Sequence, residues 1–212
     1  MDIHQTEEQQ VEQLKSLWQE YGNAIIAGLV LGFGGFIGYG YYKDNKAAEE
    51  FAASDSYQTV VELAAKDDEA FQAQGGEYVK NSKHSGYAAL TALALAKDSA
   101  EHKDWPQVEK YLQAAIDNSQ DKGISAIASI RLARVQIETE QFDKAIATVS
   151  APMPEAYKST IEEVKGDAYL KKGDVDQART AYQAAVDALG ESRNPALQMK
   201  LDDLAENIVL SK

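Results

Sequence analysis

The chain has 212 residues, a formal net charge of −13 and no cysteine. The acidic balance excludes a nucleic-acid partner, because binding to polyphosphate needs clustered Lys and Arg. The lack of cysteine excludes disulfides, thiolate metal sites and a cysteine nucleophile.

Residues 1–21 form an acidic tail with a helix signal. Thr6 and Gln9 make a capping box. Apolar residues then recur at helical spacing: Val11, Leu14, Leu17, Trp18 and Tyr21. Such a helix can bind a surface or a partner. Alternatively it leads into the next segment, with Trp18 and Tyr21 as interfacial anchors, and we favour this second interpretation.

Residues 22–42 are the long uncharged run of the sequence. As a helix, residues 24–42 span roughly 28 Å, close to the hydrocarbon thickness of a bilayer. The preceding residues are mostly acidic and no small-residue cleavage site follows, so a cleavable signal peptide is disfavoured. The run predicts one transmembrane helix. Within it Gly28, Gly32 and Gly35 share a face on which a second transmembrane helix can pack closely.

Residues 43–212 predict a soluble domain made of helices, since no run of alternating β-branched residues occurs. A first helix over 45–65 is expected to direct Phe51, Tyr57 and Val60 inward. A second begins at Asp67-Asp68. Helix pairs then follow, and a last helix begins at Asn194-Pro195. The expected pairs are 85–101 with 104–118, 122–139 with 142–150, and 157–171 with 174–188.

Three blocks of this domain align without gaps. The small residues Ala96, Ala133 and Gly166 correspond, and Val108, Ala145 and Ala178 correspond in the second helices. A period of about 34 residues with helix–turn–helix units is typical of tetratricopeptide repeats. We therefore predict an all-α protein: a short N-terminal amphipathic helix, one transmembrane helix, and an α-solenoid of about four helix pairs with a C-terminal capping helix.

No catalytic constellation accompanies these elements. His4, His84 and His102 lie far apart in the sequence, and the acidic pairs are adjacent residues that do not converge on one point of a helix. We expect no enzyme activity, no cofactor, no metal and no small-molecule substrate.

A concave protein-binding groove is implied by the resemblance to tetratricopeptide repeats, in which the first helix of each pair lines that wall. The positions that this resemblance points to are Ile130, Arg134, Glu138, Glu163, Asp167 and Lys171. The alternative is that each is an ordinary solvent-facing helix residue.

The whole chain resembles the bacterial YfgM family, most specifically over residues 130–136, 165–174 and 195–204. The resemblance implies an inner-membrane protein with a cytoplasmic N-terminus and a periplasmic repeat domain. It also implies an accessory subunit of the SecYEG translocon that works with the membrane-anchored chaperone PpiD and helps exported polypeptides reach chaperones. The other expected contact of the anchor is membrane lipid.

Orientation and role have alternatives. Lys15 precedes the span, whereas Lys43 and Lys46 follow it, so the positive-inside rule leans weakly towards a cytosolic domain. Counting the protonated amino terminus with Lys15 makes the positive charges on the two sides of the span equal. We therefore adopt the orientation that the resemblance implies. The alternative functions are a regulator that meets a cytosolic signalling factor through its tail, and a self-associating scaffold.

Overall fold

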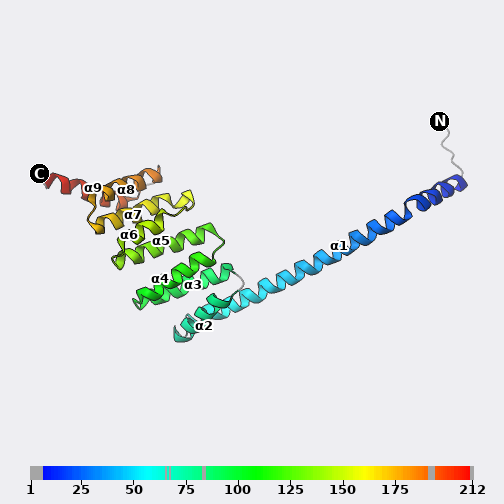
Figure 1. Ribbon diagram of the computed structural model, residues 1–212, viewed down its shortest axis with the longest axis horizontal. Coiled ribbons are helices and arrows are strands. Elements are labelled where there is room, and N and C mark those ends of the chain that lie inside the picture. Colours follow the sequence, from blue (N-terminus) through cyan, green and yellow to red (C-terminus); the bar gives the residue numbers. More distant parts are fainter. Residues whose placement is uncertain (1–6, 65, 67, 83–84, 191–193, 211–212) are drawn as a thin grey trace. The chain divides into compact units, whose positions relative to one another are not determined.

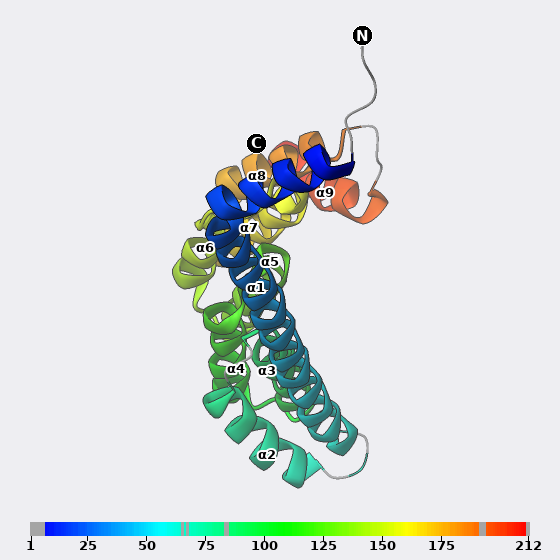
Figure 2. The same ribbon diagram turned by 90° about the vertical axis from the view of Figure 1, so that its right-hand side faces the viewer.

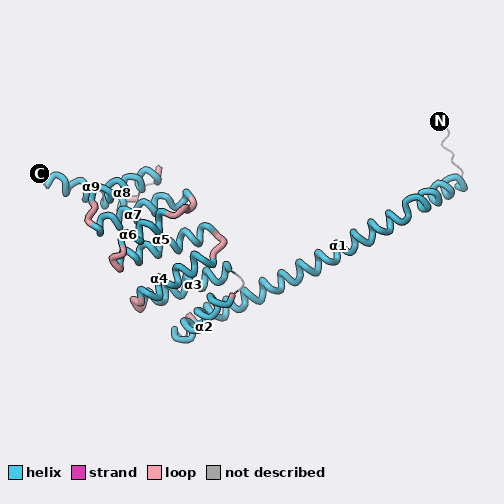
Figure 3. The backbone as a smooth tube through the Cα atoms, viewed as in Figure 1, coloured by secondary structure: helices cyan, strands magenta, loops and turns pink. Residues whose placement is uncertain are grey.

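The computed structural model describes the backbone of residues 7–64, 66, 68–82, 85–190 and 194–210, without the side chains of 7–9, 85 and 205–210. Within this part of the chain, regular structure is helical and no strand occurs (Figures 1 and 3). The elements are α1 (Glu7–Leu63), α2 (Asp68–Asn81), α3 (Ser85–Glu101), α4 (Trp105–Asn118), α5 (Lys122–Glu138), α6 (Phe142–Ser150), the 3₁₀ turn η1 (Glu155–Tyr157), α7 (Lys158–Lys172), α8 (Val175–Leu189) and α9 (Pro195–Leu210).

Within the described residues, the helices expected over 1–21, 22–42 and 45–65 form one continuous helix, α1 (Glu7–Leu63). Its sequence contains no proline, and each glycine inside a helix costs only about 1 kcal/mol relative to alanine. Nothing local therefore ends the helix at the edges of the apolar run. Thr6 of the expected capping box lies outside the described residues. The division into a tail (1–21), a span (22–42) and a soluble domain (43–212) stays a prediction.

The chain forms two compact units, residues 1–52 and 53–212. The first unit is the greater part of α1. Of the described helices, α1 is the one that is long and apolar enough to cross a membrane, and none of its most apolar window is buried within the protein. Leu31 and Phe36 are about three-quarters exposed. A core helix of a soluble domain would bury such side chains.

The second unit begins with the last turns of α1. Val60 is buried in a cluster with Phe71 of α2 and Leu95 of α3, as its predicted inward orientation requires. The Tyr57 ring stacks on the Tyr87 ring at a centroid distance of 5.2 Å. Phe51 differs from the expectation because its side chain is 77% exposed. It lies on the part of α1 that belongs to the first unit, which ends at Ala52.

The three aligned blocks share one turn geometry, which makes the repeat visible in the backbone. The turns contain Lys103, Glu140 and Gly173, all with left-handed φ values of 58°, 61° and 91°. In each turn the next residue donates a hydrogen bond to a carbonyl five positions earlier, as in a Schellman motif. The bonds join Asp104 N to Ser99 O (3.0 Å), Gln141 N to Gln136 O (2.7 Å) and Asp174 N to Tyr169 O (2.9 Å). Only the third block has glycine at this left-handed position, a conformation that glycine adopts without strain.

Acidic and amide side chains cap the helix starts, which explains why the predicted boundaries hold. The Asp121 carboxylate accepts hydrogen bonds from the amides of Gly123 (2.7 Å) and Ile124 (2.9 Å). Asp104, Asp174 and Asn194 each accept one bond from the amide three residues later. These caps satisfy backbone donors that have no partner inside the helix.

Small residues let neighbouring helices cross closely in the second unit. Each helix from α3 onward packs on the next, in chain order (Figure 2). Ala133, Ala145 and Ala178 are fully buried at these crossings. At the crossing of α7 and α8, Gly166 lies against the fully buried Tyr182 ring.

The helix α9 closes the stack. Its Leu197 and Leu204 are buried against Tyr182 and Ala185 of α8. This confirms the all-α solenoid with a C-terminal capping helix. Without α9 the apolar face of α8 would be exposed to water.

Candidate functional site

The glycine face predicted for the span is open along α1. A Cβ atom added at Gly28, Gly32 or Gly35 would meet no atom within 4 Å. The same holds for Gly34 and Gly38. Space for a second helix therefore exists at the predicted stripe, and its use for packing stays a prediction.

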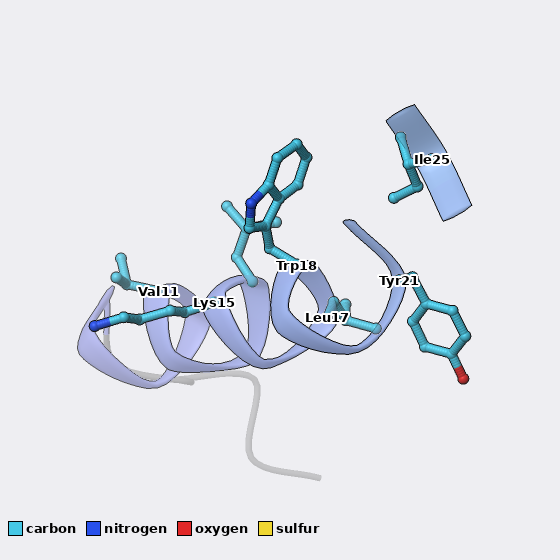
Figure 4. A pocket seen from close by; sticks show the side chains of 7 residues that line it. Val11, Lys15, Leu17, Trp18, Tyr21 and Ile25 are labelled. Carbon is cyan, nitrogen blue, oxygen red and sulfur yellow. The ribbon is translucent and has the colours of Figure 1, made fainter. Parts of the chain in front are cut away.

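The N-terminal turns of α1 carry an exposed apolar surface with one cation (Figure 4). The Trp18 indole lies against Gly22, where an added Cβ would come within 3.3 Å of two ring atoms. Figure 4 shows Trp18 and Tyr21 extending from the helix in different directions. The residues of this surface are Val11, Leu14, Lys15, Leu17, Trp18, Tyr21 and Ile25.

The predicted groove positions of α5 have different environments. Ile130 is 5% exposed and packs with Ala133 and Val149, so its side chain belongs to the core and does not line a groove. Its place on the buried face follows from its spacing of three residues from Ala133. Arg134 and Glu138 are exposed.

Two predicted groove positions of α7 are held by the capping helix. The Lys200 ammonium of α9 lies 2.9 Å from Glu163 Oε1 and 2.7 Å from Asp167 Oδ1. The Tyr182 hydroxyl donates a hydrogen bond to the same Asp167 oxygen at 2.7 Å. The two carboxylates therefore stabilise α9 on the last helix pair. Lys171, one turn further along α7, is exposed.

A cleft of about 290 Å³ lies between α3, α4 and α5. We call it the α3–α5 cleft. Its rim carries three cations: Lys97, Arg131 and Arg134. Its apolar lining consists of Leu93, Ala96, Ala100, Val108, Leu112 and Val135. Within each of the three helices, the lining residues share one face because they lie three or four positions apart. Arg134 is thus a predicted groove position that borders a concavity.

Among the described residues, no group of three or more His, Asp or Glu side chains has a geometry that could hold a metal ion. Acidic residues and His102 do gather where α2, α3 and α4 meet. The Asp98 carbonyl, together with nearby carboxylates, raises the pKa of the exposed His102 above its usual value. Of the other histidines, His4 and His84 lie outside the described residues.

Comparison with known proteins covers both the long helix and the repeats. A family model described as a tetratricopeptide repeat-like domain matches residues 15–206. A protein of Aggregatibacter actinomycetemcomitans named ancillary SecYEG translocon subunit is 32% identical over 93% of this chain and 97% of its own length. The chain belongs to the family of ancillary SecYEG translocon subunits. Proteins of the same name from Haemophilus influenzae and Escherichia coli K12 are 30% and 29% identical, over 93% and 97% of this chain and 97% and 100% of their own lengths.

The resemblance to the translocon-subunit family seen in the sequence is therefore confirmed. For this family member, sequence reasoning missed the cleft rim formed by Lys97 and Arg131 and the reach of Lys200 to α7. A signal for the first was present, since Arg131 and Arg134 lie three residues apart and so share a helix face. The second had no local signal, because Lys200 and Glu163 are 37 residues apart.

The Lys200 cluster of this family member predicts a loss of stability at alkaline pH. Burial raises the pKa of Tyr182, and its hydrogen bond to Asp167 raises the pKa further. Burial lowers the pKa of Lys200, but its contacts with Asp167 and Glu163 outweigh this effect, so its pKa is also raised. Above about pH 10 the unfolded chain therefore binds fewer protons than the folded one, and the free energy of unfolding falls as pH rises.

We expect the Tyr182 contribution to reach about 1.4 kcal/mol per pH unit in that range. Urea unfolding of the full chain, followed by circular dichroism, measures this slope in the wild type and in Tyr182→Phe. The variant should show a shallower alkaline decline. Part of the alkaline decline in the free energy of unfolding should remain in the variant, because burial also raises the pKa of Tyr111. An identical slope in both proteins would contradict the role given to Tyr182.

Proposed function

We propose that the protein is a membrane-anchored adaptor that associates with the SecYEG translocon and binds another protein through its repeat domain. The observation that carries this proposal is the match to ancillary translocon subunits over nearly the whole chain, including α1 and the helix pairs. The exposed apolar length of α1 supports the anchoring part. The absence of a predicted catalytic constellation favours binding over catalysis.

The finer role proposed is hand-over of exported polypeptides together with a PpiD-like membrane-anchored chaperone. This role requires α1 to cross a bacterial inner membrane with its N-terminus in the cytoplasm and the repeat domain in the periplasm. Stacked helix pairs provide extended surfaces suited to holding polypeptide partners. Lipid would surround the exposed Leu31 and Phe36 side chains, which no other part of the described chain covers.

Docking of the span on the translocon is proposed to use the Gly28, Gly32 and Gly35 face. Leucine at these three positions would hold a partner helix away, while keeping the segment apolar. The matched control places leucine at Gly34, Gly38 and Gly40, which lie on other faces of α1 and also have open space around them.

The test is co-purification of SecYEG with the full chain from membranes solubilised in mild detergent. The wild type and the control triple variant should retain SecYEG, and the stripe variant should lose at least about 90% of it, which requires a weakening by at least about one order of magnitude. Equal retention by both variants would refute docking through this face. A wild-type chain that purifies without SecYEG would overturn the adaptor proposal, and a complex made only of copies of this chain would favour the self-associating scaffold.

A further inference from the structure

The α3–α5 cleft combines an apolar floor with a cationic rim in a strongly acidic protein. The chain carries a formal net charge of −13, yet three cations border this one concavity. Lys97 has an ion pair with Glu101 at 3.5 Å, and both side chains are more than 60% exposed. For Arg131 and Arg134, the part of the chain that the structure describes provides no ion pair. Two of the three rim cations are therefore available to pair with a ligand.

The floor is suited to one or two bulky apolar side chains. Leu93 and Val135 are partly buried and pack against the core cluster that contains Ala96, which is 3% exposed. The small side chains of Ala96 and Ala100 leave the space that makes the concavity. Its volume of about 290 Å³ is at the lower end of ligand sites and too small for a folded element. Leu90, 37% exposed, lies three residues before Leu93 on α3.

The rim determines the polar part of the ligand. Arg131 and Arg134 share one side of α5, with Cβ atoms expected about 5–6 Å apart. Guanidinium groups bind carboxylates in a bidentate manner, and a weakly hydrated cation loses little by leaving water. Three cations on two helices exceed what the single carboxylate of a chain terminus can pair with. The complementary ligand carries two or more carboxylates close to an apolar side chain.

We infer that the α3–α5 cleft binds an internal segment of a partner polypeptide in which Asp or Glu residues flank a bulky aliphatic side chain. The aliphatic group fills the floor between Leu93 and Val135, and the carboxylates pair with Arg131, Arg134 and Lys97. This inference rests on the proposed adaptor function, since it names the chemistry of the protein that the repeat domain binds.

The test uses the full chain in nanodiscs of zwitterionic lipid, with empty nanodiscs as the blank, and three short fluorescein-labelled peptides. One peptide consists of Leu and Glu, the second of Leu and Gln, and the third of Ser and Glu. Fluorescence anisotropy should show the Leu–Glu peptide binding at least about tenfold more tightly than either of the others, and losing affinity when salt rises from about 50 to about 300 mM. Equal binding of all three peptides, or no binding of the Leu–Glu peptide up to about 1 mM, would overturn the inference.

Two variants locate the site. Arg131→Glu with Arg134→Glu should weaken Leu–Glu binding at least about tenfold, because attraction becomes repulsion at exposed positions that do not support the fold. Lys80→Glu with Lys122→Glu makes the same change in net charge on exposed residues elsewhere and should leave affinity within about twofold. Ala100→Phe fills the cleft and should abolish binding while a thermal unfolding scan confirms that the domain is folded. Equal losses in both charge-reversal variants would show attraction to the whole domain and refute a site at the cleft.

The peptide-binding experiment and the SecYEG co-purification experiment can fail independently of each other. Failure of peptide binding with SecYEG co-purification intact would overturn only the assignment of this cleft. Loss of SecYEG co-purification from the wild type would overturn the adaptor proposal, whatever the peptides do.

Discussion

Alkaline phosphatase fused after residue 212 is expected to be active in the wild-type chain and inactive when Leu31→Arg and Phe33→Arg are introduced together. The enzyme is active only where disulfides form, so activity requires export of the repeat domain. Each arginine near the centre of a span costs about 2.5–3.5 kcal/mol of insertion free energy, so the pair costs about 5–7 kcal/mol. Leu31 and Phe33 are both more than 60% exposed on α1, so lipid is the environment that the substitutions disturb.

The matched control exchanges the two residues, Leu31→Phe with Phe33→Leu, and leaves the composition of the span unchanged. Its fusion should be as active as the wild type, and alkaline carbonate should extract the double-arginine variant but not the control. An inactive wild-type fusion that still resists extraction would reverse the proposed orientation. An active, membrane-bound double-arginine fusion would show that α1 is not the anchor.

Replacing Gly166 by alanine should destabilise the last helix pair by about 2 kcal/mol. A Cβ at this position would lie 2.4 Å from two atoms of the Tyr182 ring, far inside contact distance. The ring cannot yield easily, since it is fully buried and its hydroxyl is hydrogen-bonded to Asp167. Overpacking of this kind costs about 1–3 kcal/mol. A gain of up to about 1 kcal/mol from alanine's helix propensity offsets part of a cost at the upper end of that range.

The measurement is amide hydrogen exchange of α7 and α8 in the full chain, which reports local opening of this pair. A loss of about 2 kcal/mol corresponds to exchange faster by roughly a factor of 30. Gly86→Ala in α3 is the control, because a Cβ added there would meet no atom within 4 Å. In a Tyr182→Ala background the effect of Gly166→Ala should vanish or change sign. Persistence of the full loss in that background would contradict the clash.

The success of sequence reasoning was greatest for local features. The helix starts at Asp104, Asp121 and Asn194 were predictable because a cap acts within four residues of its own position. The continuity of α1 through residues 22 and 42 was not predicted, for a related reason. Hydropathy changes sharply at residues 22 and 42, but hydropathy does not end a helix, and neither proline nor a capping turn is present there.

The candidate site was predicted less well, since exposure depends on what packs above each helix. Ile130 and Arg134 are four residues apart on α5, yet the first is in the core and the second borders the α3–α5 cleft. The repeat pattern predicted Glu163 and Asp167 as groove residues. In the folded protein the Lys200 ammonium of α9 pairs with both carboxylates. Lys97 was not predicted because its cleft exists only when α3 and α5 are neighbours.

The sequence alone determined that this protein is all-helical, carries one apolar segment long enough for a membrane and repeats with a period of about 34 residues. Those properties depend on hydropathy, spacing and caps, which act between residues close in the chain. Only the tertiary structure decided which polar side chains remain free. Ion pairs such as Lys200 with Asp167 join residues 33 positions apart, and stacking of successive helices buries some faces and leaves the Arg131–Arg134 rim open.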